Sequence, residues 1–156
     1  MIVEKYGITL ENDYEDILFT AQQFTQGGDI LFWDWARFKT AKMPLFFPAM
    51  VCYSFSCELY FKGISLKFNE TYQKTHSLVK LYNNLPENIQ DKIKVAVNDD
   101  NFDCKLNLVD KIFEESRYFF DKKKFGDKMP DIEFVISLSN SLAKIADDEI
   151  IKNKAD

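Results

Sequence analysis

Two opposite charges interrupt the most apolar stretch of the sequence. Glu58 and Lys62 lie in SCELYFKGISLKF, residues 56–68, where the flanking positions are apolar in both directions. In a helix this i, i+4 spacing, with the acidic residue first, favours an ion pair. An exposed pair of this kind contributes roughly a few tenths of a kcal/mol, whereas a buried charge needs a partner or loses its charge. The surroundings therefore indicate a buried pair in a binding site or an internal ion network.

Gly63 follows Lys62 directly and is the second unusual feature of this stretch. A glycine inside a helix costs about 1 kcal/mol relative to alanine. We expect that cost to be offset by another backbone that packs closely against this position.

Two further side chains are suited to binding phosphate. Arg117 precedes Tyr118 in the aromatic stretch IFEESRYFFD. Its guanidinium can extend to solvent, pair with Glu58 across helices, or hold a phosphate in a bidentate fork. His76 is the only histidine and lies near the expected start of a helix, where an anion is favoured and an imidazolium is disfavoured. It is either structural or a base or phosphate contact, and the second role requires Arg117 or a carboxylate beside it.

The familiar catalytic and metal-binding motifs are absent. The sequence has no glycine-rich phosphate loop, no HExxH and no GxSxG. Its three cysteines form no CxxC, and with a single histidine a zinc site is not expected. We therefore expect neither a metal nor a cofactor.

Composition indicates one globular domain, residues 1–156, with a net charge of −5 and 15% aromatic residues. The acidic balance argues against a surface that binds nucleic acid through bulk electrostatics. Two local basic clusters remain, and such clusters are usually solvated faces. They comprise Arg37, Lys39 and Lys42, and Lys122, Lys123, Lys124 and Lys128.

The N-terminus lacks the basic and apolar segments of a signal peptide, and no uncharged apolar run approaches the ~18 residues of a membrane span. We expect a cytoplasmic protein with reduced thiols and no membrane partner.

The periodicity of apolar residues predicts an all-α fold, an up-and-down bundle of about five to six helices. Asn12 or Asp13 caps a first helix, which Gly27-Gly28 breaks, and Asp29 caps a second one. A long helix over 44–68, apolar on nearly every face, is expected at the centre. The remaining helices are expected after Thr75, after Pro86, over about 103–123 and over about 131–152.

The early segment FWDWARF carries aromatic side chains on two faces of its expected helix. Aromatic residues at such spacing are usually core. Two faces of them on a short helix indicate that Phe32, Trp33 and Trp35 contribute to a subunit interface.

Three ordered elements of the chain resemble the HEPN superfamily. They are Glu58/Lys62 in the long apolar helix, Thr75-His76-Ser77-Leu78 with Leu81 and Leu85-Pro86, and the pair Arg117-Tyr118. The match spans about residues 44–121. The resemblance implies an up-and-down helical bundle, frequently a homodimer.

The resemblance also suggests functions. HEPN proteins include metal-independent RNases of toxin and defence systems, partners of nucleotidyltransferases, and inactive interaction modules. The RNases use an arginine followed four to six residues later by histidine, and no histidine follows Arg117 here. We therefore expect a nucleotide-binding, RNA-binding or partner-binding component of a bacterial defence or toxin–antitoxin-type system. Its site is expected to comprise Glu58, Lys62, His76, Arg117 and Tyr118.

Two alternatives stay open at this point. The first is an RNase in which Arg117 and His76 meet through folding and reach one phosphate together. The second is a purely structural or interaction dimer, in which Glu58, Lys62 and Arg117 form a buried ion network and the aromatic residues form the interface.

Overall fold

The computed structural model describes residues 13–40, 42–119, 121 and 130–151, and all regular structure within them is helical. The all-α prediction is confirmed. Seven α-helices lie in this part of the chain, one more than the upper end of the expected range. They are α2 (Tyr14–Phe32), α3 (Phe46–Asn69), α4 (Leu78–Asn83), α5 (Glu87–Val97), α6 (Phe102–Leu108), α7 (Ile112–Ser116) and α9 (Ile132–Ala146).

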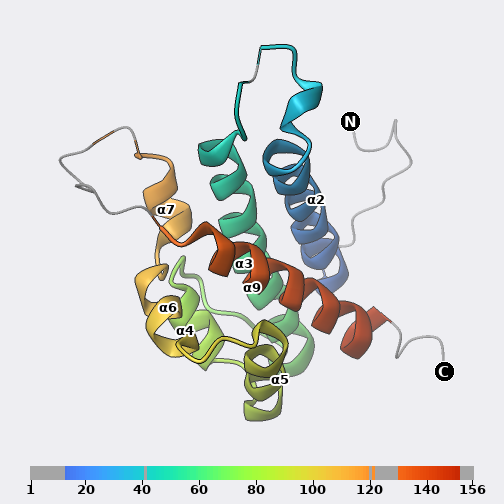
Figure 1. Ribbon diagram of the computed structural model, residues 1–156. Helices are drawn as coiled ribbons and strands as arrows, with labels where there is room; N and C mark the ends of the chain where they lie inside the picture. The colour runs from blue at the N-terminus through green and yellow to red at the C-terminus, as the bar shows by residue number, and fades with distance from the viewer. Residues whose placement is uncertain (1–12, 41, 120, 122–129, 152–156) are drawn as a thin grey trace.

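The central helix of the bundle is α3, as its apolar character predicts. It runs beside α2 in the opposite direction, α9 crosses it, and α4 and α7 pack on its other side (Figure 1). Side chains from several faces of α3 are fully buried, among them Met50, Tyr53, Cys57, Phe61 and Ile64. A helix surrounded in this way fixes the position of every polar side chain that it carries.

The predicted break at Gly27-Gly28 is wrong, because α2 continues through both glycines to Phe32. Gly28 lies against the ring of Tyr53, where an added Cβ would come within 2.9 Å of ring carbons. Glycine here allows close packing of α2 on α3 and does not end the helix. Asp29 lies inside α2 instead of capping a second helix, and its carboxylate accepts a 2.6 Å hydrogen bond from the Tyr53 hydroxyl. Asp13 caps the helix, as one of the two expected residues.

Gly63 also marks a close contact, but with a side chain. A Cβ at this position would lie 2.7 Å from Cδ2 of Leu18 on α2. The expected close approach is therefore present, and the group that approaches is the Leu18 side chain and not a backbone.

The single helix predicted over 103–123 is wrong, because the chain turns between α6 and α7. Asp110 lies at this turn and accepts hydrogen bonds from residues at the start of α4. Its backbone carbonyl accepts from the N–H of Leu78 at 2.8 Å, and its carboxylate accepts from the Val79 N–H at 2.9 Å and from the Ser77 hydroxyl at 2.6 Å. These bonds satisfy N–H groups that a helix start leaves without a partner. The turn thereby ties α6 and α7 to α4.

The short helix after Thr75 begins later than expected. Ser77 is its cap and accepts a hydrogen bond from the Lys80 N–H, while Thr75 accepts from the Ser77 N–H. His76 therefore lies in the segment before the helix and not in its first turn.

The last helix is shorter than the predicted 131–152. Asp131 caps α9 by accepting from the Phe134 N–H, and the helix passes into a π-helical turn over Asp147–Ile151. Lys152, the last residue of the predicted helix, lies outside the described residues. None of the described helices combines the length and the apolar character that crossing a membrane requires.

Candidate functional site

The predicted Glu58–Lys62 pair is present and buried. The Glu58 side chain is 1% exposed, and Lys62 Nζ donates to its Oε1 at 2.6 Å. Lys62 is also largely covered, and its ammonium lies 5.8 Å from the ring centroid of Tyr72. A carboxylate withdrawn from water in this way needs more than one polar partner.

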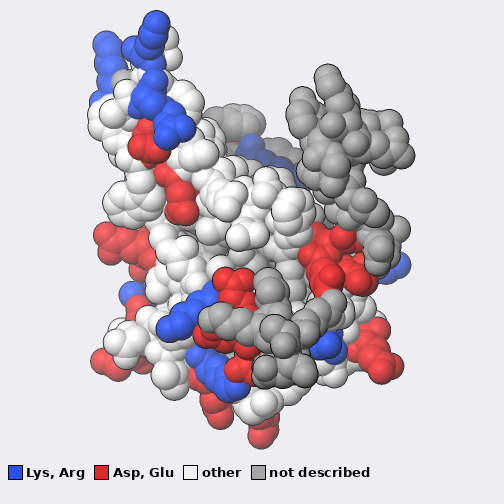
Figure 2. Space-filling model, turned by 90° about the vertical axis from the view of Figure 1, so that its right-hand side faces the viewer, with Lys and Arg blue, Asp and Glu red and all other residues white. Residues whose placement is uncertain are grey.

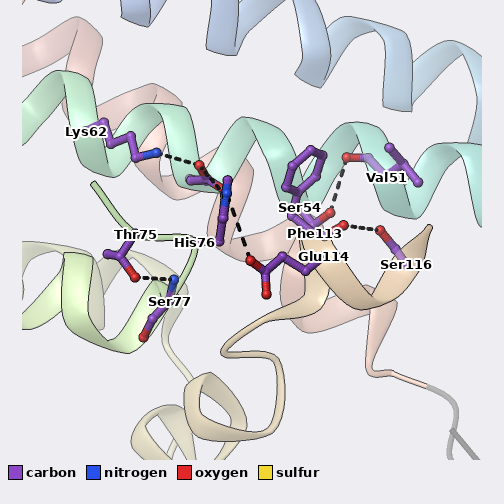
Figure 3. A network of polar contacts seen from close by, with 10 residues as sticks. Val51, Ser54, Lys62, Thr75, His76, Ser77, Phe113, Glu114 and Ser116 are labelled. Atoms are coloured by element: carbon purple, nitrogen blue, oxygen red, sulfur yellow. Dashed lines mark hydrogen bonds and ion pairs between the residues drawn. The ribbon is translucent and has the colours of Figure 1, made fainter. Parts of the chain in front are cut away.

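The second partner of Glu58 is His76. Nδ1 of the imidazole lies 3.0 Å from both carboxylate oxygens of Glu58. The opposite nitrogen, Nε2, lies 3.9 Å from Oε1 of Glu114. Figure 3 shows His76 between the α3 helix and Glu114, with Lys62 on the far side of the shared carboxylate. The His76 side chain is 47% exposed, whereas the Glu58 side chain that its Nδ1 contacts is buried.

Arg117 does not pair with Glu58, contrary to the pairing that the sequence suggested. Its guanidinium carbon lies 5.4 Å from the ring centroid of Phe113 and 5.6 Å from that of Tyr118, within cation–π range. Among the described residues no carboxylate forms an ion pair with it. The proposed buried network therefore holds His76 in the place expected for Arg117.

The ring of Phe113 brings the two candidate phosphate-binding groups together. The His76 ring centroid is 5.8 Å from that of Phe113, and the same ring also contacts the Arg117 guanidinium. Phe113 itself stacks on Phe55 of α3 at 4.5 Å, and Phe55 meets Phe24 of α2 edge-on at 4.7 Å. This row of rings runs from α7 through α3 to α2 and fixes α7 against the buried end of the site.

The charges of the site nearly cancel. Glu58 and Glu114 supply two carboxylates, and Lys62 and Arg117 supply two cations, so protonation of His76 gives the site a net positive charge. At the outer edge of α7, burial raises the pKa of Glu115, and the nearby Asp110 and Glu114 carboxylates raise it further. Nowhere in the described part of the chain do three or more metal-ligating side chains group together.

Sequence reasoning placed Glu58, Lys62, His76, Arg117 and Tyr118 in one site, and the structure gathers them around α3 and α7. It missed Glu114 and Phe113. Both lie within four residues of Arg117 in the sequence. Both residues lie on the short α7 helix and contact His76. The sequence predicted one long helix over this region and therefore gave no signal for these contacts.

The aromatic residues expected at an interface lie elsewhere. Phe32 packs partly on the core, Trp35 is half-buried in a short 3₁₀ turn, and Trp33 is 65% exposed. The nearby basic residues Arg37 and Lys39 are exposed on the connection between α2 and α3. That connection forms one end of the molecule in Figure 1, where Figure 2 shows lysine and arginine side chains gathered.

Comparison with known proteins gave no relative: no family model, curated protein or solved structure matches this chain.

Proposed function

We propose that this protein binds the phosphate groups of RNA or of a nucleotide at the surface formed by Arg117, His76 and Tyr118. The observation that carries the proposal is the state of Arg117. Its guanidinium lies over the rings of Phe113 and Tyr118, His76 contacts the same Phe113 ring, and within the described part of the chain Arg117 has no carboxylate partner. A guanidinium held in this way keeps its donors for a bidentate contact with phosphate.

The other arginine of the chain supports this interpretation by contrast. The sequence contains two arginines, Arg37 and Arg117. Arg37 forms an ion pair with Asp34 three residues earlier. Arg117 forms no such pair within the described part of the chain, and it shares the ring of Phe113 with His76.

Glu58 and Lys62 act as positioning residues in this account. Glu58 fixes Nδ1 of His76 from the buried side, so that Nε2 faces outward, and Lys62 offsets the charge of the carboxylate. Tyr118, beneath the guanidinium, supplies a ring on which a base can stack. Glu114 beside Nε2 disfavours a phosphate there, unless His76 is protonated and the ligand displaces the carboxylate.

The resemblance to the HEPN superfamily extends the proposal to a setting. It supports a component of a bacterial defence or toxin–antitoxin-type system, with a homodimer or a nucleotidyltransferase-like protein as partner. The surface that we assign to such a partner is the connection between α2 and α3, where Trp35 is half-buried and Arg37 and Lys39 are exposed.

The test compares the two arginines. Binding of a fluorescently labelled short single-stranded RNA, and of AMP as competitor, is measured by anisotropy with the wild-type protein, Arg117→Ala and Arg37→Ala. We expect Arg117→Ala to weaken binding roughly tenfold or more, as loss of a charged hydrogen bond does, and Arg37→Ala to leave it within about twofold. Equal binding by Arg117→Ala and the wild type, or no binding by any of the three proteins, contradicts the proposal.

A second candidate function is RNA cleavage, which the Glu58–His76 contact specifically favours. A histidine whose Nδ1 is fixed by a buried carboxylate presents Nε2 as a general base or acid. In such a reaction Nε2 accepts the proton of a ribose 2′-hydroxyl while its oxygen attacks the adjacent phosphorus, and Arg117 offsets the charge of the phosphate. The 5′-oxygen leaves and takes a proton from water.

Cleavage is tested by incubating end-labelled RNA with the wild type and with His76→Asn and resolving the products on a denaturing gel. Products with a 2′,3′-cyclic phosphate that His76→Asn does not form support this function. Intact RNA with the wild type, under conditions where it is bound, restricts the site to binding.

A further inference from the structure

A second hollow lies apart from the His76 site, along α9. It has a volume of about 590 Å³, and its lining comes from the end of α2, from Ala96 of α5 and from one face of α9. Cavities of this size are typical of small-molecule sites. Neither Arg117 nor any other member of the His76 site lines it.

One wall of this groove is an exposed aromatic ring. Trp33 lines the groove and is 65% exposed. Its orientation is fixed by an edge-on contact with Phe32, with the ring centroids 4.8 Å apart at 87°. The apolar floor beside it is formed by Ile132 and Ile136 of α9. An indole held in this way offers a flat face on which a planar ring can stack.

The part of α9 that lines the groove also carries polar side chains that have no partner among the described residues. Glu133, Asn140 and Lys144 all line the groove, and none of them forms a hydrogen bond or ion pair with its side chain in the described structure. Asn140 and Lys144 lie one helical turn apart on the same face, and Glu133 lies about two turns from Asn140. The groove thus has an acceptor, an amide and a cation in order along one helix.

We propose that this groove binds a purine nucleoside monophosphate. The base stacks on Trp33, Glu133 and the Asn140 amide hydrogen-bond to its edge, and Lys144 binds the phosphate. An asparagine amide matches the paired donor and acceptor of a purine edge, and a glutamate accepts from its amino group. The inference concerns a site other than the one formed by His76 and Arg117, and it does not depend on that function.

The adjoining surface limits the ligand to one phosphate. Beside this groove, and sharing Lys144 and Ala96 with it, lies an adjoining hollow of about 560 Å³ between α5 and α9. Its lining includes the carboxylates of Asp91, Asp148 and Glu149, and Glu149 is paired with Lys92. Further phosphates of a polynucleotide would enter this acidic region, where like charges repel them. A monophosphate ends at Lys144 and avoids it.

The test uses Trp33 as its own reporter. The chain has two tryptophans, so Trp35→Phe leaves Trp33 as the only indole. Quenching of its fluorescence is measured with AMP, GMP, the two nucleosides and a short single-stranded RNA. We expect saturable quenching by AMP or GMP, at least about tenfold weaker binding of the matching nucleoside, and weaker binding of the RNA than of the monophosphate.

Two variants and a control complete the test in the Trp35→Phe background. Asn140→Leu is expected to weaken nucleotide binding at least about tenfold, and Lys144→Gln to reduce it to the level of the nucleoside. Lys80→Gln, an exposed lysine on α4, is expected to leave it unchanged. Circular dichroism confirms that each variant is folded.

The inference is overturned if neither nucleotide gives saturable quenching at millimolar concentration, if Asn140→Leu and Lys144→Gln bind as the parent does, or if the RNA binds more tightly. His76→Asn separates this inference from the proposed function, because it is expected to leave the quenching unchanged. Loss of quenching in His76→Asn would place the ligand at the His76 site. It would contradict nucleotide binding in the groove and leave the proposed function standing.

Discussion

Two polar clusters lie two residues apart on α3 and differ in almost every physical respect. On one face the hydroxyls of Thr25, Ser56 and Ser139 join α2, α3 and α9 through contacts of 2.6, 3.0 and 3.0 Å. All three residues are buried. On the other face Glu58 begins a charged cluster that reaches solvent at His76.

The contrast separates a closed network from an open one. Each hydroxyl of the Thr25–Ser56–Ser139 triad is satisfied by the other two and carries no charge, so the triad aligns three helices and brings no charged group to the surface. The Glu58 cluster is satisfied at its buried end only. At its other end the half-exposed His76 imidazole and the Arg117 guanidinium both contact the ring of Phe113, and we interpret this end as the binding site.

The largest effect is expected from the charged cluster. Glu58→Gln leaves the buried Lys62 without its carboxylate and removes the anchor of His76, so we expect the free energy of unfolding to fall by about 3 kcal/mol. Urea denaturation followed by circular dichroism measures it. The matched control is Glu114→Gln at the open end, expected to cost less than about 1 kcal/mol because that carboxylate is partly exposed. Equal costs for the two substitutions would show that the cluster is not divided into a buried and an open end.

The closed triad is expected to respond more weakly. Ser139→Ala removes one hydroxyl, and Thr25 and Ser56 keep their mutual 2.6 Å contact, so we expect a loss of about 1 kcal/mol by the same measurement. RNA binding is expected to stay at the wild-type value. The control is Ser137→Ala, whose hydroxyl bonds to no described residue, with a change within about 0.5 kcal/mol. A loss of RNA binding in Ser139→Ala would remove the distinction between the two clusters.

The smallest effect concerns the acidic edge of α7. Because burial and two neighbouring carboxylates raise the pKa of Glu115, the folded protein binds this proton more tightly than the unfolded chain does. Ionised Glu115 therefore disfavours folding at neutral pH, and the penalty disappears as the pH falls below its ordinary pKa of about 4.3.

Glu115→Gln is accordingly expected to raise the free energy of unfolding at pH 7 by at most a few tenths of a kcal/mol, about the range of exposed substitutions. The gain should vanish near pH 4, as followed by denaturation across that range. A gain that grows on acidification would reverse the sign of the argument.

The sequence predicted the parts of this structure that depend on burial alone. The apolar surroundings of Glu58 and Lys62 were sufficient to predict a buried pair on a central helix, and the structure confirms both. The structure also places the five predicted site residues in one chain of contacts, but the predicted pairing of Glu58 with Arg117 is wrong. An arginine and a histidine are both plausible partners for a carboxylate, and only the packing of α4 and α7 on α3 decides between them.

The remaining errors have one physical origin, which is long-range contact. Gly27-Gly28 was interpreted as a break because glycine is a poor helix former, and the ring of Tyr53 that requires a small residue there is 25 positions away. Asp110 was placed inside a helix because its neighbours have helical spacing. Its bonds to the start of α4, more than 30 positions earlier, end that helix instead.

The central claim, that the open end of the charged cluster is a binding site, is tested most directly at His76, the only histidine of the chain. Its imidazole nitrogens give a single set of signals in a long-range ¹H–¹⁵N correlation spectrum, with no assignment required. We predict that a short single-stranded RNA shifts the Nε2 signal of the wild type in a saturable way. Arg117→Ala is expected to require roughly tenfold or more RNA for the same shift, and Ser139→Ala to respond as the wild type does. An Nε2 signal that does not move at RNA concentrations where anisotropy reports binding would contradict the claim.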